Sequence, residues 1–316
     1  MKCKFCKKDV YIKLHHPKMN LCKEHFIEYF ERKVKKTIEK YKLLKKDEKI
    51  LVALSGGKDS AVVSYVLKKF NYPIQCLHIN LGIGEYSDRC EEYARKQCKM
   101  IDVPLHVVKI RELVGAGVGE VKISRPTCSY CGTTKRYITN KFAYDNNFDV
   151  VVTGHNLDDE ASFILSNVLY WNTQYLAKQG PFLPGEGKFV KRVKPLYETP
   201  EREIEAYASA VGIDYITDTC PYSKGAITLK YKEIINQLDE MRPGIKIKFV
   251  RGFLKKRYLF EGDVERGEIK ECKVCGMPSG VEVCSFCRIW GLKEGVDLKI
   301  EIKHLLPLMG KDVEGI

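Results

Sequence analysis

A short apolar run that stops at two adjacent glycines is the feature that most constrains this fold. Residues 50–54 read Ile-Leu-Val-Ala-Leu, residues 55–60 read Ser-Gly-Gly-Lys-Asp-Ser, and a second apolar run follows at 61–67. This order predicts a strand, a tight turn and a helix, because glycine tolerates positive φ angles. The free N–H groups of the helix start, together with Lys58 and the hydroxyls of Ser55 and Ser60, favour a bound phosphate. An ordinary strand-to-helix turn is the alternative.

Strand and helix signals alternate between residues 49 and 225. Apolar runs predict strands at 49–54, 74–80, 105–109 and 149–153, with helical segments such as 88–100 between them. This alternation predicts an α/β fold with a Rossmann-like parallel sheet and helices on both faces. Ligands bind beyond the carboxyl ends of such strands, so the turn at Ser55, the pair His78 and Ile79, and Gly154 are expected around one crevice. A buried structural role is the alternative for His78.

The charge balance is strongly positive. The chain has 54 Lys and Arg against 41 Asp and Glu, a formal net charge of +13. Such a surplus favours a polyanionic partner such as nucleic acid, although richness in Lys and Glu is also typical of proteins from hot environments. No apolar stretch is long enough to span a membrane and no signal-peptide pattern opens the chain, so a cytoplasmic location is expected.

Cysteines cluster at the N-terminus in a pattern typical of metal binding. In a reducing compartment, pairs of cysteines separated by two residues favour metal or redox chemistry over disulfides. A segment this small cannot form its own core, which favours a structural zinc over a redox pair. His15 and His16 could compete with His25, but only His25 repeats the two-residue gap. The expected zinc ligands are Cys3, Cys6, Cys22 and His25.

A second cysteine set lies near the C-terminus, again in a segment too short for its own core. The paired Cys-x-x-Cys spacing predicts another zinc site, with ligands Cys272, Cys275, Cys284 and Cys287. The basic stretch 246–257 precedes it, with Phe249, Phe253 and Tyr258 among or beside its lysines. This stretch could lie on RNA, or its aromatic side chains could pack in the core.

Three further cysteines point to a different centre. If residues 128–136 are helical, Cys128, Cys131 and Lys135 lie on one face. Cys220, which precedes a proline in a later loop, could complete three ligands of an iron–sulfur cluster and leave one iron open. A buried packing role is the alternative for Cys220.

Acidic residues follow the strand expected at 149–153. Asp158, Asp159 and Glu160 open the helix expected at 161–169, where carboxylates usually serve as caps and dipole partners. Here they also face the expected crevice, and Asp159 is the expected magnesium ligand.

Two glycine-rich segments have no dinucleotide-binding spacing. Residues 114–119 are expected to form a mobile loop. Residues 180–187 are expected to be flexible, and the cations that follow could form a basic rim beside the crevice or belong to a solvated loop: Lys188, Lys191, Arg192 and Lys194.

Together these residues resemble the TtuA-type tRNA 2-thiouridine synthetases, which are PP-loop enzymes related to the TtcA enzymes and the wobble-uridine thiolases. The hexapeptide at 55–60 matches the SGGxDS signature of that family, and the resemblance covers nearly the whole chain. It implies ATP, Mg²⁺, a 4Fe-4S cluster and two Zn²⁺ ions as cofactors. It also implies a zinc finger at 1–27, a PP-loop catalytic domain at 28–240 that begins with a linker helix at 28–46, and a basic segment with a zinc ribbon at 241–316.

The resemblance also implies roles for individual residues. Cys128, Cys131 and Cys220 correspond to the cluster ligands, and Lys135 and Asp159 to catalytic positions. The implied cofactor-binding residues are Ala53, Leu54, Ser55, Gly56, Gly57, Lys58, Asp59, Ser60, His78, Ile79, Lys135, Gly154 and Asp159.

The implied reaction is sulfur transfer to tRNA. ATP adenylates a uridine, and sulfur then replaces its O2 to give 2-thiouridine or 5-methyl-2-thiouridine. The implied sulfur donor is free sulfide or a ubiquitin-like thiocarboxylate carrier. A second copy of the chain, in a homodimer, is also among the expected partners. Two alternatives remain: a PP-loop tRNA-modifying enzyme that uses a cysteine persulfide without a cluster, and a non-enzymatic zinc protein that binds RNA.

Overall fold

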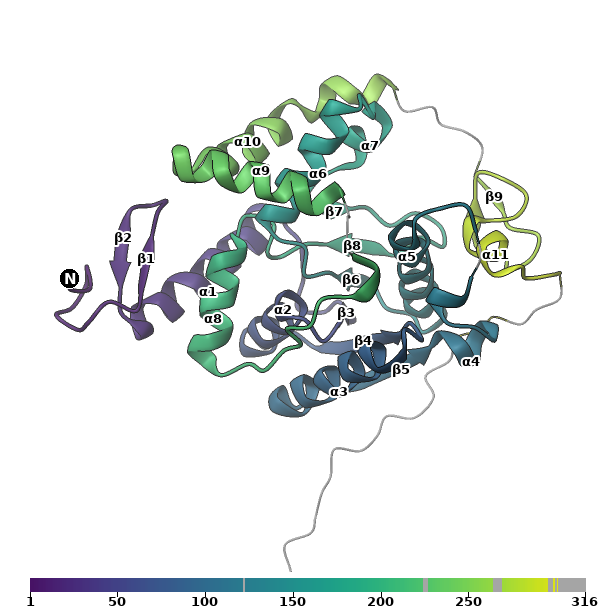
Figure 1. The fold of residues 1–316 in the computed structure, drawn as a ribbon, viewed down its shortest axis with the longest axis horizontal. Helices are drawn as coiled ribbons and strands as arrows, with labels where there is room; N and C mark the ends of the chain where they lie inside the picture. The colour runs from purple at the N-terminus through teal and green to yellow at the C-terminus, as the bar shows by residue number, and fades with distance from the viewer. Residues whose placement is uncertain (122, 224–226, 264–268, 295–297, 299, 301–316) are drawn as a thin grey trace, which may run out of the picture.

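A six-stranded sheet forms the centre of the molecule, in the order β5-β4-β3-β6-β8-β7 (Figure 1). The computed structural model describes residues 1–121, 123–223, 227–263, 269–294, 298 and 300. The strands are β3 (Ile50–Ala53), β4 (Ile74–Asn80), β5 (Leu105–Lys109), β6 (Val150–Val152), β7 (Phe182–Leu183) and β8 (Lys191–Val193). All pair in parallel except β7, which is antiparallel to β8. The predicted α/β fold is confirmed, while β7 and β8 were not expected.

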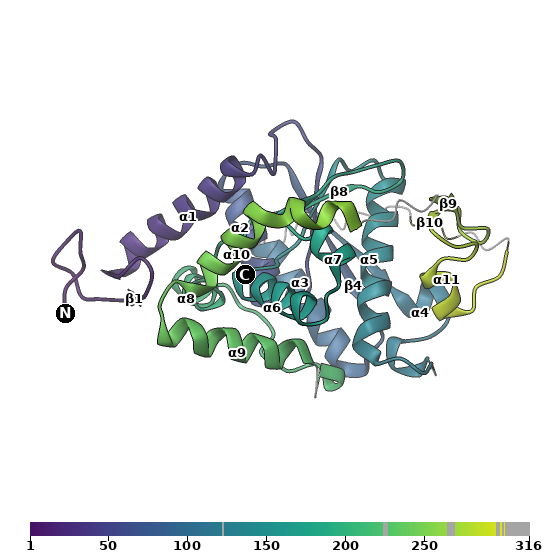
Figure 2. The same cartoon turned by 90° about the horizontal axis from the view of Figure 1, so that it is seen from above.

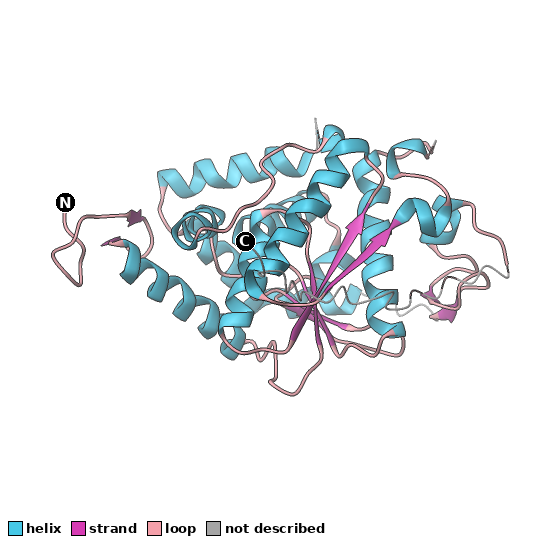
Figure 3. Ribbon diagram, turned by 90° about the horizontal axis from the view of Figure 1, so that it is seen from below, coloured by secondary structure: helices cyan, strands magenta, loops and turns pink. Residues whose placement is uncertain are grey.

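Helices cover both faces of this sheet (Figure 3). Successive side chains of a strand point to opposite faces, so Ile50 and Val52 of β3 enter one core and Leu51 enters the other. The first core contains residues of α1, α2, α3 and α8, and the second contains residues of α5. These helices are α1 (Lys23–Lys40), α2 (Lys58–Lys69), α3 (Gly84–Ile101), α5 (Thr127–Asp145) and α8 (Glu201–Val211).

The remaining large helices form a lobe beside the sheet (Figure 2). This helical lobe consists of α6 (Leu157–Leu169), α7 (Thr173–Lys178), α9 (Ile227–Met241), α10 (Ile245–Lys256) and the 3₁₀ helix η3 (Arg257–Asp263). Its core includes Phe249 and Phe253, so these two aromatics of the basic stretch pack inward, whereas Tyr258 is 56% exposed. Lys246 is also buried, where its ammonium lies 2.6 Å from Asp158.

Small hairpins mark the two cysteine-rich ends. The strands β1 (Ile12–Leu14) and β2 (Met19–Leu21) pair before α1, and β9 (Lys270–Glu271) pairs with β10 (Pro278–Ser279) before α11 (Ser285–Trp290). The expected linker helix is present as α1, but it begins at Lys23, directly after Cys22, and ends at Lys40. In the described part of the chain, no helix is long and apolar enough to cross a membrane.

The two glycine-rich segments contain short regular elements. Residues 114–119 run from the last residue of α4 (Ile110–Val114) into the 3₁₀ helix η1 (Val118–Glu120), and Val118 is fully buried. The basic rim expected after residue 187 stays a prediction, although most of its cations are engaged in other contacts. Lys188, Lys191 and Lys194 pair with Glu271, Glu48 and Glu160. Arg192 is largely buried in β8.

The turn between β3 and α2 depends on one glycine for its backbone shape. Gly56 has φ +84°, a left-handed conformation, and a Cβ added there would lie 2.5 Å from the Cys90 carbonyl oxygen. Gly57 has φ −83° and only the Ser55 Oγ within 3.4 Å of such a Cβ. The turn therefore tolerates a side chain at residue 57 far better than at residue 56.

We expect Gly56→Ala to lower the free energy of unfolding by about 2 kcal/mol or more, because alanine adds both left-handed strain and a backbone clash. Gly57→Ala is the matched control and should change it by less than about 1 kcal/mol. Urea unfolding followed by circular dichroism measures both. Equal losses in the two variants would contradict this account of the turn.

Candidate active site

The turn after β3 is held by its own serines. The Ser60 Oγ accepts a hydrogen bond from the Ser55 amide at 3.0 Å and lies 3.0 Å from the Ser55 Oγ. Gly57, the N-cap residue of α2, offers no side-chain cap to the first turn of that helix. Uncapped N–H groups at a helix N-terminus favour an anion, so this turn fits the phosphate site that the sequence predicts.

The turn after β6 packs directly on the turn after β3. A Cβ at Gly154 would lie 2.7 Å from the Ser60 amide nitrogen, so no other residue fits at this position. Asn156 caps α6 by accepting from the Asp158 and Asp159 amides, and its Nδ2 donates to Asp59 at 3.0 Å. The two loops thus form one unit.

Alternating charges extend from this unit to α8 and α9. Lys58 pairs with Glu201, and Lys232 lies 2.6 Å from Glu201 and 2.9 Å from Asp159. Burial opposes the charge on Lys232, yet the Asp159 and Glu201 carboxylates raise the pKa of Lys232 well above its usual value. Burial raises the pKa of Asp59, an effect that the adjacent Lys58 opposes. Sequence reasoning missed Glu201 and Lys232, which no motif marks.

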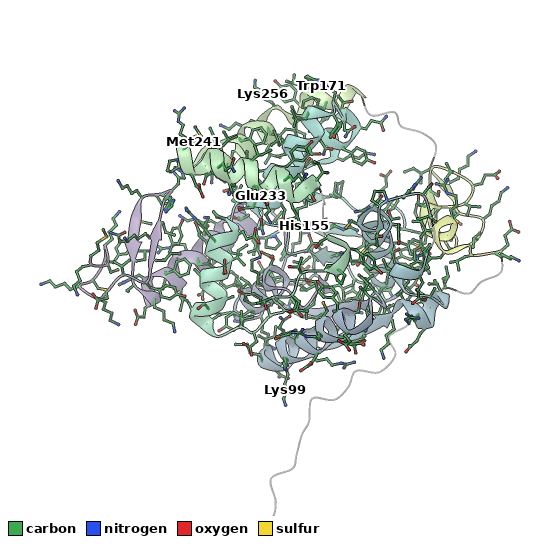
Figure 4. The ribbon with its side chains drawn as sticks, in the orientation of Figure 1. Lys99, His155, Trp171, Glu233, Met241 and Lys256 are labelled. Atoms are coloured by element: carbon green, nitrogen blue, oxygen red, sulfur yellow. The ribbon has the colours of Figure 1, made fainter. Side chains whose placement is uncertain are left out.

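These turns open into a cavity of about 340 Å³ that faces α5. It brings together seven predicted site residues: Ala53, Ser55, Asp59, Ser60, Lys135, Gly154 and Asp159. Leu54, Gly56, Gly57, Lys58, His78 and Ile79 do not line it. Figure 4 labels His155, another lining residue, near the middle of the view.

The cavity is rich in cations. Lys135, Arg136 and Arg192 line it, and the Arg192 Nε is buried without a hydrogen-bond partner among the described residues. Burial and the nearby Lys194 ammonium lower the pKa of His155 to about 4, so this imidazole is neutral at neutral pH. A buried guanidinium and two further cations fit a polyanion such as a nucleotide triphosphate.

His78 is buried and makes a structural contact, which was the alternative to a place at the crevice. Its Nδ1 lies 2.9 Å from the Leu54 carbonyl oxygen, and the side chain is 2% exposed. Burial lowers the pKa of His78, so the ring is neutral and Nδ1 donates this bond. The ring therefore links β4 to the residue that follows β3, while the expected place of Ile79 in the cofactor-binding crevice stays a prediction.

The three cysteines of the expected cluster come from two elements. Cys128 and Cys131 lie on α5, seven and four residues before Lys135, so the three share one face of the helix. Cys220 precedes the 3₁₀ helix η2 (Pro221–Ser223), which packs on α5. Cys128 is exposed, and its Sγ lies 3.2 Å from the Tyr222 carbonyl oxygen. Cys131 and Cys220 are half-buried beside one apolar cluster. Partly exposed thiols on two adjoining elements fit a cluster with an accessible iron.

Each terminal cysteine set forms a compact group. The ligand atoms of Cys3, Cys6, Cys22 and His25 all lie within 4.8 Å of one another, as do those of Cys272, Cys275, Cys284 and Cys287. The Cys6 and Cys22 sulfurs are 3.7 Å apart, and those of Cys275 and Cys284 are 3.8 Å apart. Tetrahedral zinc with Zn–S bonds of about 2.3 Å requires sulfurs about 3.8 Å apart, so both groups fit zinc. His25, rather than His15 or His16, completes the first group.

The comparisons with known proteins agree with this geometry. Residues 27–225 match the PP-loop domain family, and residues 2–27 match the N-terminal LIM domain of 2-thiouridine synthetase TtuA. The chain belongs to the TtuA-type branch of the PP-loop family. The resemblance inferred from its motifs is thereby confirmed.

Relatives of this PP-loop protein include enzymes and a solved structure. The chain is 65% identical over 300 residues to a tRNA-5-methyluridine(54) 2-sulfurtransferase of Pyrococcus horikoshii, covering 95% of this chain and 97% of the relative. It is 44% identical to the protein of that name from Thermotoga maritima, covering 92% and 96%. The U34-tRNA thiolase NcsA of Methanococcus maripaludis, solved with its 4Fe-4S cluster, has a TM-score of 0.81 at 33% identity, covering 93% and 98%.

We expect Lys232→Gln to lower the free energy of unfolding by about 2 kcal/mol, because Asp159 and Glu201 would lose a shared ammonium. Lys230→Gln is the control, since Lys230 lies on the same helix and is exposed. Urea unfolding at neutral pH compares the two. A Lys232 variant as stable as the Lys230 variant would show that the charge network does not stabilise the fold.

Proposed function

We propose that this chain is an ATP-dependent tRNA 2-sulfurtransferase that converts a uridine to its 2-thio derivative. The observation that carries the proposal is a single cavity lined on one side by the turns after β3 and β6 and on the other side by α5. Ser55, Ser60 and Gly154 form the phosphate-binding wall, and Lys135 of α5 forms the other. Cys131 lies on α5 one turn before Lys135, so the nucleotide wall and the cysteine centre adjoin.

The proposed reaction has two steps, adenylation of the uridine and replacement of its O2 by sulfur. The uridine O2 attacks the α-phosphorus of ATP and pyrophosphate leaves, which gives an adenylated base. A sulfur nucleophile then attacks C2, and the C2–O2 bond breaks as AMP leaves with the original oxygen. Adenylation is needed because a carbonyl oxygen is a poor leaving group and a phosphate ester is a good one.

The chain supplies binding and electrostatics for these steps. The α2 N-terminus and the hydroxyls of Ser55 and Ser60 hold the phosphates, and Lys135 stabilises charge at the α-phosphate. Asp159 and Asp59 are the carboxylates that would hold Mg²⁺, which would offset the triphosphate charge. Lys232 lies 2.9 Å from Asp159, so its ammonium holds that carboxylate in place.

Cys128, Cys131 and Cys220 would hold the 4Fe-4S cluster. Bound there, the cluster would leave one iron open to carry the incoming sulfur. The NcsA relative, solved with such a cluster, supports this assignment. The proposed sulfur donor is either free sulfide or a ubiquitin-like thiocarboxylate carrier.

The proposed target is a uridine in the T-loop, because the more similar relatives carry 5-methyluridine(54) in their names and the U34 enzyme is more distant. The proposed division of the chain is a zinc finger at 1–27, the catalytic domain at 28–240 and a C-terminal segment at 241–316. Location in the cytoplasm fits a tRNA substrate.

A homodimer is also part of the proposal. Exposed aromatic and apolar side chains lie between the end of α6 and α7, among them Leu169, Tyr170, Trp171 and Tyr175 at 57–72% exposure. Contiguous exposed apolar surface often marks a protein interface, and these four side chains carry no charge. A light-scattering mass of one chain at micromolar concentration would contradict self-association.

We expect Cys220→Ala to abolish thiolation and to remove the broad absorption at roughly 400 nm that iron–sulfur clusters show. Cys98→Ala is the control, because Cys98 is buried on α3 outside the site. The assay uses anaerobically reconstituted protein with ATP, sulfide and unmodified tRNA, followed by mass spectrometry of nucleosides. Thiolation that persists without iron would favour the persulfide enzyme. Absence of pyrophosphate release in wild-type protein would favour a non-enzymatic RNA-binding protein.

We expect about two zinc ions per chain, measured by elemental mass spectrometry of purified protein. His25→Ala and Cys275→Ser should each lose one, because each removes a ligand from a closed set of four. His15→Ala is the control and should retain both ions. Full zinc content in the His25 variant would contradict the assigned ligand set.

A further inference from the structure

The C-terminal ribbon, residues 269–294, packs on α5, the helix that carries Lys135 and two of the proposed cluster ligands (Figure 1). Its buried Phe286 and Cys287 belong to the same apolar core as Ile138 and Phe142 of α5. The proposed function gives this ribbon a zinc ion but no part in the reaction. Its contacts with α5 indicate one.

Two contacts anchor the ribbon near the middle of α5. The Tyr137 ring of α5 stacks on the Phe286 ring, with ring centres 3.8 Å apart and planes 7° apart. The Lys188 Nζ donates to the Gly276 carbonyl oxygen at 2.8 Å, and the Lys188 carbonyl oxygen accepts from Asn140 of α5 at 2.8 Å. The ribbon is therefore held against α5 at residues that follow Lys135.

A third contact lies closer to the cysteine centre. The Trp290 Nε1 donates to the Thr134 Oγ1 at 3.1 Å, and Thr134 is fully buried. Thr134 follows Cys131 by three residues and directly precedes Lys135, so it lies in the helical turn between them. Because a hydrogen bond constrains both distance and angle, this contact fixes the position of that turn relative to the ribbon.

The Trp290 indole lies between the ribbon and the proposed cluster ligands. It packs against the core that contains Phe286 and also against the apolar cluster beside which Cys131 and Cys220 lie. Its neighbour Ile289 is a buried member of that cluster. Trp290 therefore connects the ribbon to the surroundings of the two thiols.

The first half of α5 depends on contacts of this kind. The α5 residues that pack in the core beneath the sheet come from its second half, among them Ile138 and Phe142. In the first half, Tyr130 donates to the Val118 carbonyl oxygen at 2.9 Å, and the Cys128 Sγ lies 3.2 Å from the Tyr222 carbonyl oxygen. Loops and the ribbon, rather than strands, thus hold the part of α5 that carries the chemistry.

We infer that Trp290 is a positioning residue for the proposed reaction. Through Thr134 it fixes the α5 turn that joins Cys131 to Lys135, and so sets the spacing between the cysteine centre and the nucleotide cavity. This inference rests on the proposed function for the identity of the reaction. Reacting groups must lie about 3–3.5 Å apart, so a shift of about 1 Å in this turn slows the reaction. ATP binding is spared, because the phosphate-binding turn after β3 belongs to other elements.

Two single substitutions, alone and combined, remove the hydrogen bond. Trp290→Phe keeps an aromatic ring but loses the N–H donor, and Thr134→Val keeps the shape of the side chain but loses the acceptor. Thr133→Val is the matched control, because the Thr133 hydroxyl donates to the Ser129 carbonyl oxygen within α5. Zinc content should match wild type in all variants, since the stacked rings and the lysine contact still anchor the ribbon.

The first readout is alkylation of Cys131 by iodoacetamide in zinc-loaded protein without a cluster, followed by peptide mass spectrometry. We expect Cys131 to react about fivefold faster in Trp290→Phe and in Thr134→Val, because the released turn opens more often. Exposed Cys128 and buried Cys98 should react as in wild type. Faster alkylation of every cysteine, Cys98 included, would show that Trp290 only stabilises the fold, and would overturn the inference.

The second readout is the thiolation rate per bound iron at saturating ATP, sulfide and tRNA. We expect each single variant to be about tenfold slower than wild type, with a KM for ATP within about twofold. The double variant should be no slower than the slower single variant, because both substitutions remove one shared bond. Thr133→Val should stay within about twofold of the wild-type rate.

Wild-type alkylation and a wild-type rate in Trp290→Phe would overturn the inference. Losses that multiply in the double variant would overturn it too, because Trp290 and Thr134 would then act independently. Failure of the proposed function looks different. In that case wild-type protein forms no thionucleoside, while Cys131 still reacts faster in Trp290→Phe, since alkylation needs neither tRNA nor a cluster.

Discussion

The contact between Gly154 and the Ser60 amide is the constraint on which the candidate site depends. β3 and β6 are adjacent and parallel, with Val52 opposite Val152, so the two following turns leave the sheet at the same level. A Cβ at Gly154 would collide with the Ser60 amide, so the turns can pack only with glycine there. This contact fixes the start of α6, and with it Asp159, beside the phosphate-binding turn.

The features of the fold and of the candidate site that the sequence predicted are those set by residues close together in the chain. The apolar run before Ser55 and the alternation of strands and helices follow from short-range patterning, which a parallel sheet strongly constrains. The cysteine pairs are equally local, because a zinc site needs ligands at short spacing from each of two turns. His25 could be chosen over His15 and His16 for the same reason.

The residues that sequence missed are those whose partners lie far along the chain. Lys232 contacts Asp159 across 73 positions, and Lys58 contacts Glu201 across 143. Nothing in a chain with 54 basic residues distinguishes Lys232 from its neighbours. Arg192 was expected on a basic rim or in a solvated loop, but the pairing of β8 with β6 places it, largely buried, in the lining of the cavity. Residue type alone cannot show which cations are buried, because burial is set by the pairing of distant strands.

The same distinction decides what a net charge of +13 means. A surplus of that size says that a polyanion is a favourable partner, but it does not say where. The ion pairs narrow down where a polyanion could bind, because a lysine paired with a carboxylate contributes little positive potential at the surface. Lys188, Lys191, Lys194 and Lys246 are all paired in this way, which takes the loop after residue 187 and the start of α10 out of consideration. At the candidate site the charges are paired across helices instead, because the Lys232 ammonium lies 2.9 Å from Asp159 in the first turn of α6 and 2.6 Å from Glu201 in the first turn of α8. The geometry of the candidate site therefore depends on the same two helix N-termini.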